Sequence, residues 1–190
     1  MTRARLVPWV LGAHACTLFG LLVFAAMTGL PARAPLALPG ASGMPLAWLF
    51  NLLAWTGPGF VVAGVAWRLR GGLGPDAGRV AGIALQLWLL SALAFAAQGL
   101  LPLDVEELDA GASRWHALAW MLWNLAFAAA ALLAGLALRA VRMPSLGLFA
   151  IVALGLLAPG VFGSGIGERV VLACWWLWTA VLAWRLPRQR

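Results

Sequence analysis

Six long apolar stretches make up most of this chain, and only short connectors separate them. A helix that crosses a bilayer needs about 20 mostly apolar residues, because the hydrocarbon layer is about 30 Å thick and a helix rises about 1.5 Å per residue. The sequence therefore predicts an all-α integral membrane protein, a single six-transmembrane-helix bundle over residues 1–190. The predicted spans cover residues 6–30, 45–67, 80–101, 115–138, 144–162 and 165–186.

The composition excludes a soluble domain of this length. Apolar residues make up 64% of the chain and charged residues only 10%, against about 45–50% and about 25% in ordinary globular proteins. Too few polar side chains are present to cover a surface that faces water. The net charge of +7 comes from arginines placed between the apolar stretches, not from a basic stripe. We therefore expect membrane lipids or another membrane protein as partners, and no nucleic acid.

The arginines predict the orientation of the spans. Ten of the 13 arginines lie on one side of the predicted membrane, with a single acid, Asp76. The other side carries Arg33, Arg114 and Arg169 and the other five of the six acids. Because short cytoplasmic loops are rich in basic residues, we expect both termini in the cytoplasm and the acidic connector 102–114 outside. The predicted location is a bacterial cytoplasmic (inner) membrane.

The chain offers no obvious ligand set for a cofactor or a metal. Its two histidines, His14 and His116, lie in predicted spans at heights that differ by roughly 15–20 Å, so they cannot both bind one haem iron within one subunit. The two cysteines, Cys16 and Cys174, lie in separate apolar stretches, which excludes a disulfide framework and a CxxC metal site. We expect His14 to be a hydrogen-bonded packing residue. The sequence predicts no cofactor and no metal site.

Several polar and small residues lie at membrane depth. In the second span, Pro58 lacks a backbone N–H and crowds the preceding turn, so the Gly57-Pro58-Gly59 sequence predicts a kink or break there. Amide side chains inside spans usually join helices by hydrogen bonds, and we expect this of Asn51, Gln86, Gln98 and Asn124. Small residues allow helices to approach closely, and we expect this of Gly12, Gly20, Gly64 and Gly135.

Polar side chains gather at the predicted outer surface. Asp104 follows the third span, His116 begins the fourth, and Glu168 and Arg169 begin the sixth; with Asn51 below them, these are the candidate ligand-binding residues. A carboxylate beside an imidazole suits acid–base chemistry, a guanidinium binds phosphate, and clustered acids bind divalent cations. The same residues also suit structural pairing at helix N-termini, with Arg114 as a further partner.

Three functions fit these features. The leading hypothesis is a non-enzymatic envelope protein that binds lipid or a partner membrane protein through the outer residues. The alternative is a membrane enzyme that acts on a lipid-linked substrate at the outer leaflet, with His116 as base, Asp104 as its orienting carboxylate and Arg169 as anion clamp. The second alternative is a small transporter that uses the break at Pro58. No GxSxG, HExxH or P-loop motif appears, so the only candidate catalytic residues are His116 and Asp104.

Short elements spread over nearly the whole chain carry a family resemblance. They are residues 37–45 with Leu49-Phe-Asn51 and 59–64, then 99–104 with Trp115-His116, and finally Gly167-Glu-Arg169 with the following tryptophans. They resemble the opening, central and closing elements of the bacterial and archaeal membrane family "domain of unknown function 998". Leu101 stands where that family usually has phenylalanine, and Glu168 where it usually has glutamine. The resemblance implies six membrane helices and no settled activity.

Overall fold

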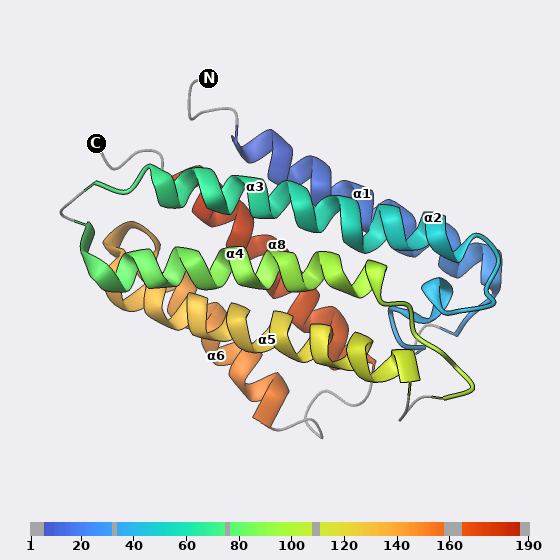
Figure 1. The fold of residues 1–190 in the computed structure, drawn as a ribbon. Helices are drawn as coiled ribbons and strands as arrows, with labels where there is room; N and C mark the ends of the chain where they lie inside the picture. The colour runs from blue at the N-terminus through green and yellow to red at the C-terminus, as the bar shows by residue number, and fades with distance from the viewer. Residues whose placement is uncertain (1–5, 32–33, 75–76, 108–110, 158–164, 187–190) are drawn as a thin grey trace.

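The computed structural model describes residues 6–31, 34–74, 77–107, 111–157 and 165–186, and within these ranges the regular structure is entirely helical (Figure 1). Six helices are long and apolar enough to cross a membrane. They cover Leu6–Thr28, Ala47–Gly71, Gly78–Leu100, Gly111–Ala137, Arg139–Leu156 and Ile166–Arg185. These segments match the six stretches expected from the sequence, and they are compatible with a multi-pass membrane protein.

In the described residues, ten helical elements make up these spans and one of their connections. They are α1 (Leu6–Thr28), η2 (Leu38–Gly40), α2 (Ala47–Asn51), η3 (Leu52–Thr56), α3 (Gly57–Gly71), α4 (Gly78–Leu100), α5 (Gly111–Ala137), η5 (Arg139–Val141), α6 (Arg142–Leu157) and α8 (Ile166–Arg185). The elements η2 and η5 are single 3-10 turns, whereas η3 is π-helical. The second span is therefore built from three consecutive elements, α2, η3 and α3.

A change of helix type replaces the break that the sequence predicts in the second span. The Gly57 N–H donates to the carbonyl of Leu52, five residues earlier, which widens this turn to a π-turn. Pro58, which has no N–H to donate, then lies in the first turn of α3, where the backbone tolerates it. The helix continues from Ala47 to Gly71 without interruption.

The six spans form a closed ring of neighbours. Each span packs against the next one along the chain, and α8 packs against both α6 and α1. The start of α1 and the end of α8 lie at the same end of the bundle (Figure 1). We call this end the arginine end, after Arg68, Arg70, Arg79, Arg139, Arg142 and Arg185, and the opposite end the acidic end, after Asp104, Glu106, Glu107 and Glu168.

Aromatic rings fill the interior between α4, α5 and α8. Phe95 of α4 stacks on Trp175 of α8 with ring centroids 4.4 Å apart, and Trp88 meets Trp178 edge-on at 5.7 Å. All four of these side chains are fully buried. Since lipid chains are as apolar as these rings, close packing and dispersion hold such helices together better than apolar burial does.

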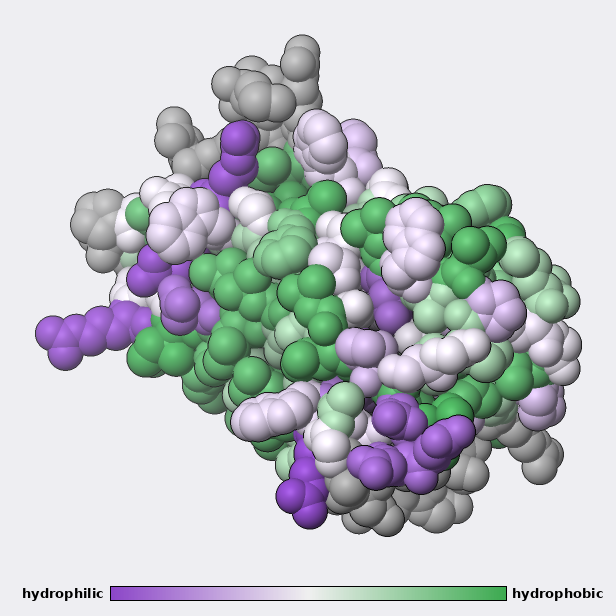
Figure 2. All heavy atoms as spheres, turned by 45° about the vertical axis from the view of Figure 1, so that its right-hand side comes forward, coloured by the Kyte–Doolittle hydropathy of each residue, from purple (hydrophilic) through white to green (hydrophobic). Residues whose placement is uncertain are grey.

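The lateral surface of the bundle is largely apolar. Figure 2 shows broad hydrophobic areas, with hydrophilic side chains in small separate groups. Large apolar side chains on several helices point outward, including Phe19, Leu22 and Leu125, which are 58–63% exposed. An apolar surface of this extent suits contact with lipid chains rather than water.

Two glycines bring the second span into close contact with α4. A Cβ at Gly59 would lie 2.6 Å from the backbone nitrogen of Ala96, and a Cβ at Gly99 would collide with Thr56. The Thr56 hydroxyl donates to the Ala96 carbonyl at 3.3 Å across this contact. Of the glycines expected from the sequence to allow close packing, Gly20 and Gly135 contact other helices, whereas Gly12 and Gly64 face open space.

Candidate functional site

The first turn of α8 binds the short backbone segment that follows α1. Glu168 accepts the Leu36 N–H at its Oε2 atom over 3.1 Å. Arg169 donates from Nη2 to the Ala34 carbonyl at 3.0 Å and from Nη1 to the Gly165 carbonyl. We call residues 34–36 the strap. The sequence suggested structural pairing for Glu168 and Arg169, and the hydrogen bonds observed for them go to backbone groups of the strap and of Gly165, which precedes α8.

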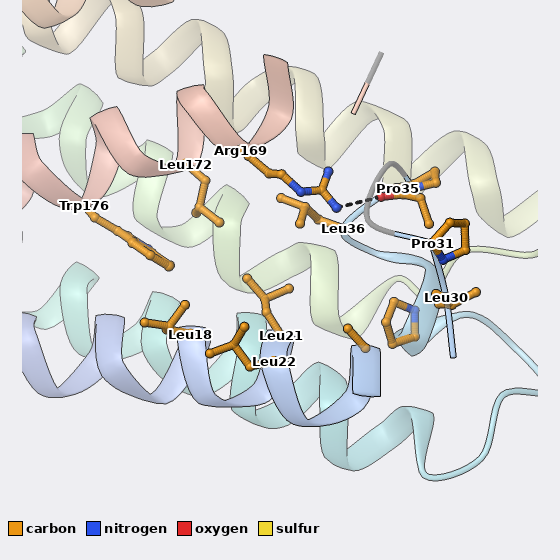
Figure 3. Close-up of a pocket in the computed structure, with 13 residues that line it drawn as sticks. Leu18, Leu21, Leu22, Leu30, Pro31, Pro35, Leu36, Arg169, Leu172 and Trp176 are labelled. Atoms are coloured by element: carbon orange, nitrogen blue, oxygen red, sulfur yellow. Dashed lines mark hydrogen bonds between the residues drawn. The ribbon is translucent and has the colours of Figure 1, made fainter. Parts of the chain in front are cut away.

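Arg169 also lines a largely apolar pocket between α1 and α8, where its guanidinium lies between Leu172 and Pro35 (Figure 3). This α1–α8 pocket has a volume of about 400 Å³. Arg169 is the only charged side chain among the described residues that line it. The apolar lining comes from both helices and from the strap: Leu18, Leu21, Leu22, Pro35, Leu36, Leu172 and Trp176.

The bonds of Arg169 leave it able to bind an anion. Both of its acceptors, the Ala34 and Gly165 carbonyls, are neutral groups. Neither hydrogen bond therefore offsets the positive charge of the guanidinium. A guanidinium carries five N–H groups in a planar fork, and these two bonds use only two of them. The remaining N–H groups suit a carboxylate or phosphate, which a guanidinium binds with two parallel hydrogen bonds.

His116 and Glu168 line a second cavity on the other side of the strap. This His116 cavity has a volume of about 290 Å³ and lies between α4, α5, α8 and η3. Its lining includes Gln98 and three tryptophans as well as His116 and Glu168. It shares Pro35 and Leu36 with the α1–α8 pocket. The structure thus brings together three of the candidate residues, His116, Glu168 and Arg169, around one strap.

Asp104 and His116 have separate hydrogen-bond partners. The Nδ1 atom of His116 lies 2.8 Å from the Leu101 carbonyl, which can only accept, so Nδ1 carries the proton. The Asp104 carboxylate accepts the N–H of Glu106 at 3.0 Å. The backbone N–H and carbonyl of Asp104 both bond to the Ser113 hydroxyl at 2.9 Å. The acid–base role considered for His116 and Asp104 stays a prediction.

Asn51 bonds to the turn that follows the strap. Its Nδ2 donates to the Gly40 carbonyl at 2.8 Å. Gly40 is packed so closely that a Cβ there would lie 2.7 Å from the ring of Phe50. Asn51 lines neither of the two cavities described above. Its observed contact holds η2 against α2.

The other polar residues at membrane depth follow the expected role only in part. His14 donates from Nε2 to the Thr179 hydroxyl at 2.8 Å and joins α1 to α8, which confirms the expected packing role. Asn124 bonds within its own helix, to Trp120. Gln98, expected to join helices, instead has an Nε2 atom without a partner in the described part of the chain. Sequence reasoning also missed the tryptophans of the His116 cavity, because nothing distinguishes them from packing residues.

The described residues form no metal centre, and comparisons with other proteins do not identify a relative of the chain. Within residues 6–31, 34–74, 77–107, 111–157 and 165–186, no three His, Cys, Asp or Glu side chains come together as a metal site would require. Comparison with protein-family models, curated proteins and solved structures finds no match for this chain. The resemblance carried by its short sequence elements therefore stays a prediction.

Proposed function

We propose that this chain is a non-enzymatic protein of a bacterial cytoplasmic membrane and that it binds an anionic lipid. The hydrocarbon chain of the lipid occupies the α1–α8 pocket, and its phosphate binds the guanidinium of Arg169. One observation carries this proposal: Arg169 is the one charged side chain among the described residues that line a largely apolar pocket. Membership of the family that the sequence resembles is part of the same proposal.

The chemistry of the pocket matches an amphiphile. Apart from Arg169, the described lining carries one polar side-chain group, the indole N–H of Trp176, which is too little for a sugar, a nucleotide or a peptide backbone. The leucine, alanine and proline side chains that make up most of the lining suit a hydrocarbon chain. Two lining residues of α1, Leu18 and Leu22, are 44% and 63% exposed on the lateral surface. This exposure supports entry of the chain sideways from the bilayer rather than from water.

The charge asymmetry supports an outer-leaflet location for the bound head group. Six arginines of the described residues lie at the arginine end, and positive residues are typical of the cytoplasmic side. With that end in the cytoplasm, Arg169 lies at the outer leaflet. Both termini are then cytoplasmic, as the same bias predicts.

The test measures lipid retained by the purified protein with native mass spectrometry, using phosphatidylglycerol against phosphatidylcholine. Wild-type protein is expected to retain phosphatidylglycerol preferentially. Arg169→Ala should lower this retention about tenfold, which corresponds to about 1.4 kcal/mol, and Arg169→Lys should keep part of it. Ala25→Trp, which places a large ring in the pocket while the arginine remains, should lower the retention of both lipids.

Arg114→Ala is the matched control, because Arg114 is an arginine at the same end that does not line the pocket. It should leave the lipid preference unchanged. Equal retention of phosphatidylglycerol by wild type, Arg169→Ala and Ala25→Trp would exclude this site.

A further inference from the structure

The carboxylate of Glu168 is the one charged group among the described side chains that line the His116 cavity. Its Oε2 atom accepts the N–H of Leu36, which is a neutral donor. Within the described part of the chain, Glu168 forms no ion pair with an arginine or a histidine. A partly buried charge among apolar side chains is costly unless a group of opposite charge pairs with it. The cavity therefore favours a cation as its occupant.

The Nε2 atom of His116 is a second acceptor in this cavity. Nδ1 donates to the Leu101 carbonyl at 2.8 Å, so Nε2 of the neutral ring can only accept. Nε2 makes no hydrogen bond within the described part of the chain, although His116 is only 7% exposed. Buried polar atoms are nearly always paired. An occupant of the cavity with an N–H or O–H group would provide the missing donor.

The unpaired N–H groups around the cavity are closed off from such an occupant. They belong to Gln98, Trp55 and Trp123, which are 1–2% exposed, and each N–H nitrogen is fully enclosed. The polar side-chain atoms that can meet an occupant are therefore acceptors, chiefly those of Glu168 and His116. An anion has nothing to bind here, and a neutral donor would leave the negative charge of the carboxylate without a partner.

We infer that the His116 cavity binds a primary ammonium group, which belongs either to a free amine or to the head group of an aminophospholipid. An ammonium carries three N–H donors and no acceptor, so it pairs with both Glu168 and His116. The partly exposed indole of Trp120 also lines the cavity, and indole faces attract cations. A metal ion would lack ligands, because no three His, Cys, Asp or Glu side chains of the described residues come together.

The size of the cavity and its place in the fold fit this inference. Its volume of about 290 Å³ is at the lower end of ligand pockets, which measure roughly 300–1,000 Å³, and suits a small head group. Neither Glu168 nor His116 lines the α1–α8 pocket. The inference therefore does not depend on the lipid site proposed there.

The experiment compares ethanolamine with choline, because methyl groups replace the N–H groups of the ammonium in choline. One arm measures saturation-transfer NMR with the two free amines and the full chain in dodecyl maltoside. The other arm measures retention of phosphatidylethanolamine and phosphatidylcholine with the same acyl chains by native mass spectrometry. We expect a preference of about tenfold for the primary ammonium. A preference in the first arm identifies a free amine, and a preference in the second alone identifies a head group. No preference in either arm overturns the inference.

Two variants test whether the ammonium occupies this cavity. Glu168→Gln removes the negative charge and keeps an acceptor oxygen for the Leu36 N–H, so it should abolish the preference while the strap stays bound. Ala117→Trp fills the cavity from an exposed position of α5 and should also abolish it. The matched controls are Glu106→Gln and Leu118→Trp, because both residues are exposed and lie outside the cavity.

Each result for these variants decides the question. A wild-type preference in Glu168→Gln or in Ala117→Trp overturns the inference, and so does loss of the preference in Glu106→Gln or in Leu118→Trp. If Glu168→Gln does not fold, Ala117→Trp decides, since its side chain replaces no buried group. Arg169→Ala should keep the preference, because both lipids carry the same phosphate. Failure of this site is therefore distinguishable from failure of the proposed lipid site.

Discussion

Glu168 and Arg169, adjacent in the sequence, hold the same strap with opposite polarity: Glu168 accepts the N–H of Leu36, and Arg169 donates to the carbonyl of Ala34. Each of the two residues also lines a different cavity, Glu168 the His116 cavity and Arg169 the α1–α8 pocket. The strap is therefore a wall shared by both cavities. Its position depends on the first turn of α8.

Loss of the Glu168 carboxylate should loosen the strap. In Glu168→Ala the Leu36 N–H loses a charged acceptor, and hydrogen bonds to charged groups contribute about 1.5–3 kcal/mol. Amide hydrogen exchange in the strap should accelerate about tenfold or more, measured by mass spectrometry of the full chain. Glu168→Gln keeps an acceptor oxygen and should show a smaller increase.

Glu106→Ala is the control for this prediction. Glu106 is an exposed carboxylate at the same end of the bundle. Its replacement by alanine should leave amide hydrogen exchange in the strap unchanged. Equal exchange rates in Glu168→Ala and wild type would mean that the Leu36–Glu168 bond does not hold the strap.

One added methyl group should separate α3 from α4 at Gly59. A Cβ at Gly59 would meet backbone atoms of Ala96, which cannot move aside as a flexible side chain would. Overpacking of this kind costs about 1–3 kcal/mol, so Gly59→Ala should lower the Tm in detergent. Gly64→Ala adds the same methyl group to the same helix in open space and should keep or slightly raise the Tm. A Gly59→Ala protein as stable as Gly64→Ala would contradict the close contact.

The contrast between Gly59 and Gly64 shows which parts of the fold the sequence could predict. Span number and approximate bounds depend on the length of apolar stretches, which is a local property, and the structure confirms them. Which glycine faces a neighbour depends on the rotation of each helix against the next, which no local pattern specifies. Of the kink or break expected at Pro58, the break does not occur, because a π-turn accommodates the missing N–H within a continuous helix.

The candidate site was predictable to a similar degree. Charge and position along the chain placed His116, Glu168 and Arg169 at one end of the bundle, where they surround the strap. The partners were not predictable, since Glu168 and Arg169 bind backbone groups that carry no sequence signal. Gln98 looked like an ordinary joining residue of a membrane helix. Only the arrangement around it reveals that its Nε2 atom lacks a partner.

The His14–Thr179 hydrogen bond should couple α1 to α8. The hydroxyl of Thr179 donates to the Trp176 carbonyl and accepts from Nε2 of His14, so it connects the two helices. Interhelical hydrogen bonds in membrane proteins average about 0.6 kcal/mol and reach about 1.7 kcal/mol. A double-mutant cycle of His14→Phe and Thr179→Val, measured by unfolding in detergent, should give a coupling energy in this range.

Thr17→Val provides the control cycle with His14→Phe. The Thr17 hydroxyl bonds within α1, to the Ala13 carbonyl, so we expect a coupling energy near zero. If the two cycles give the same value, the hydrogen bond to Thr179 does not join the helices energetically.

The orientation in the membrane can be tested by labelling single cysteines in intact cells with a membrane-impermeant maleimide. The background carries Cys16→Ala and Cys174→Ala, which removes both native thiols. Glu106→Cys, in the acidic connector, should react from outside. Gly74→Cys, an exposed position between Arg70 and Arg79, should react only after the membrane is permeabilised, because basic loops stay in the cytoplasm. The opposite pattern would place Arg169 at the cytoplasmic leaflet, and the lipid bound there would have to come from that side.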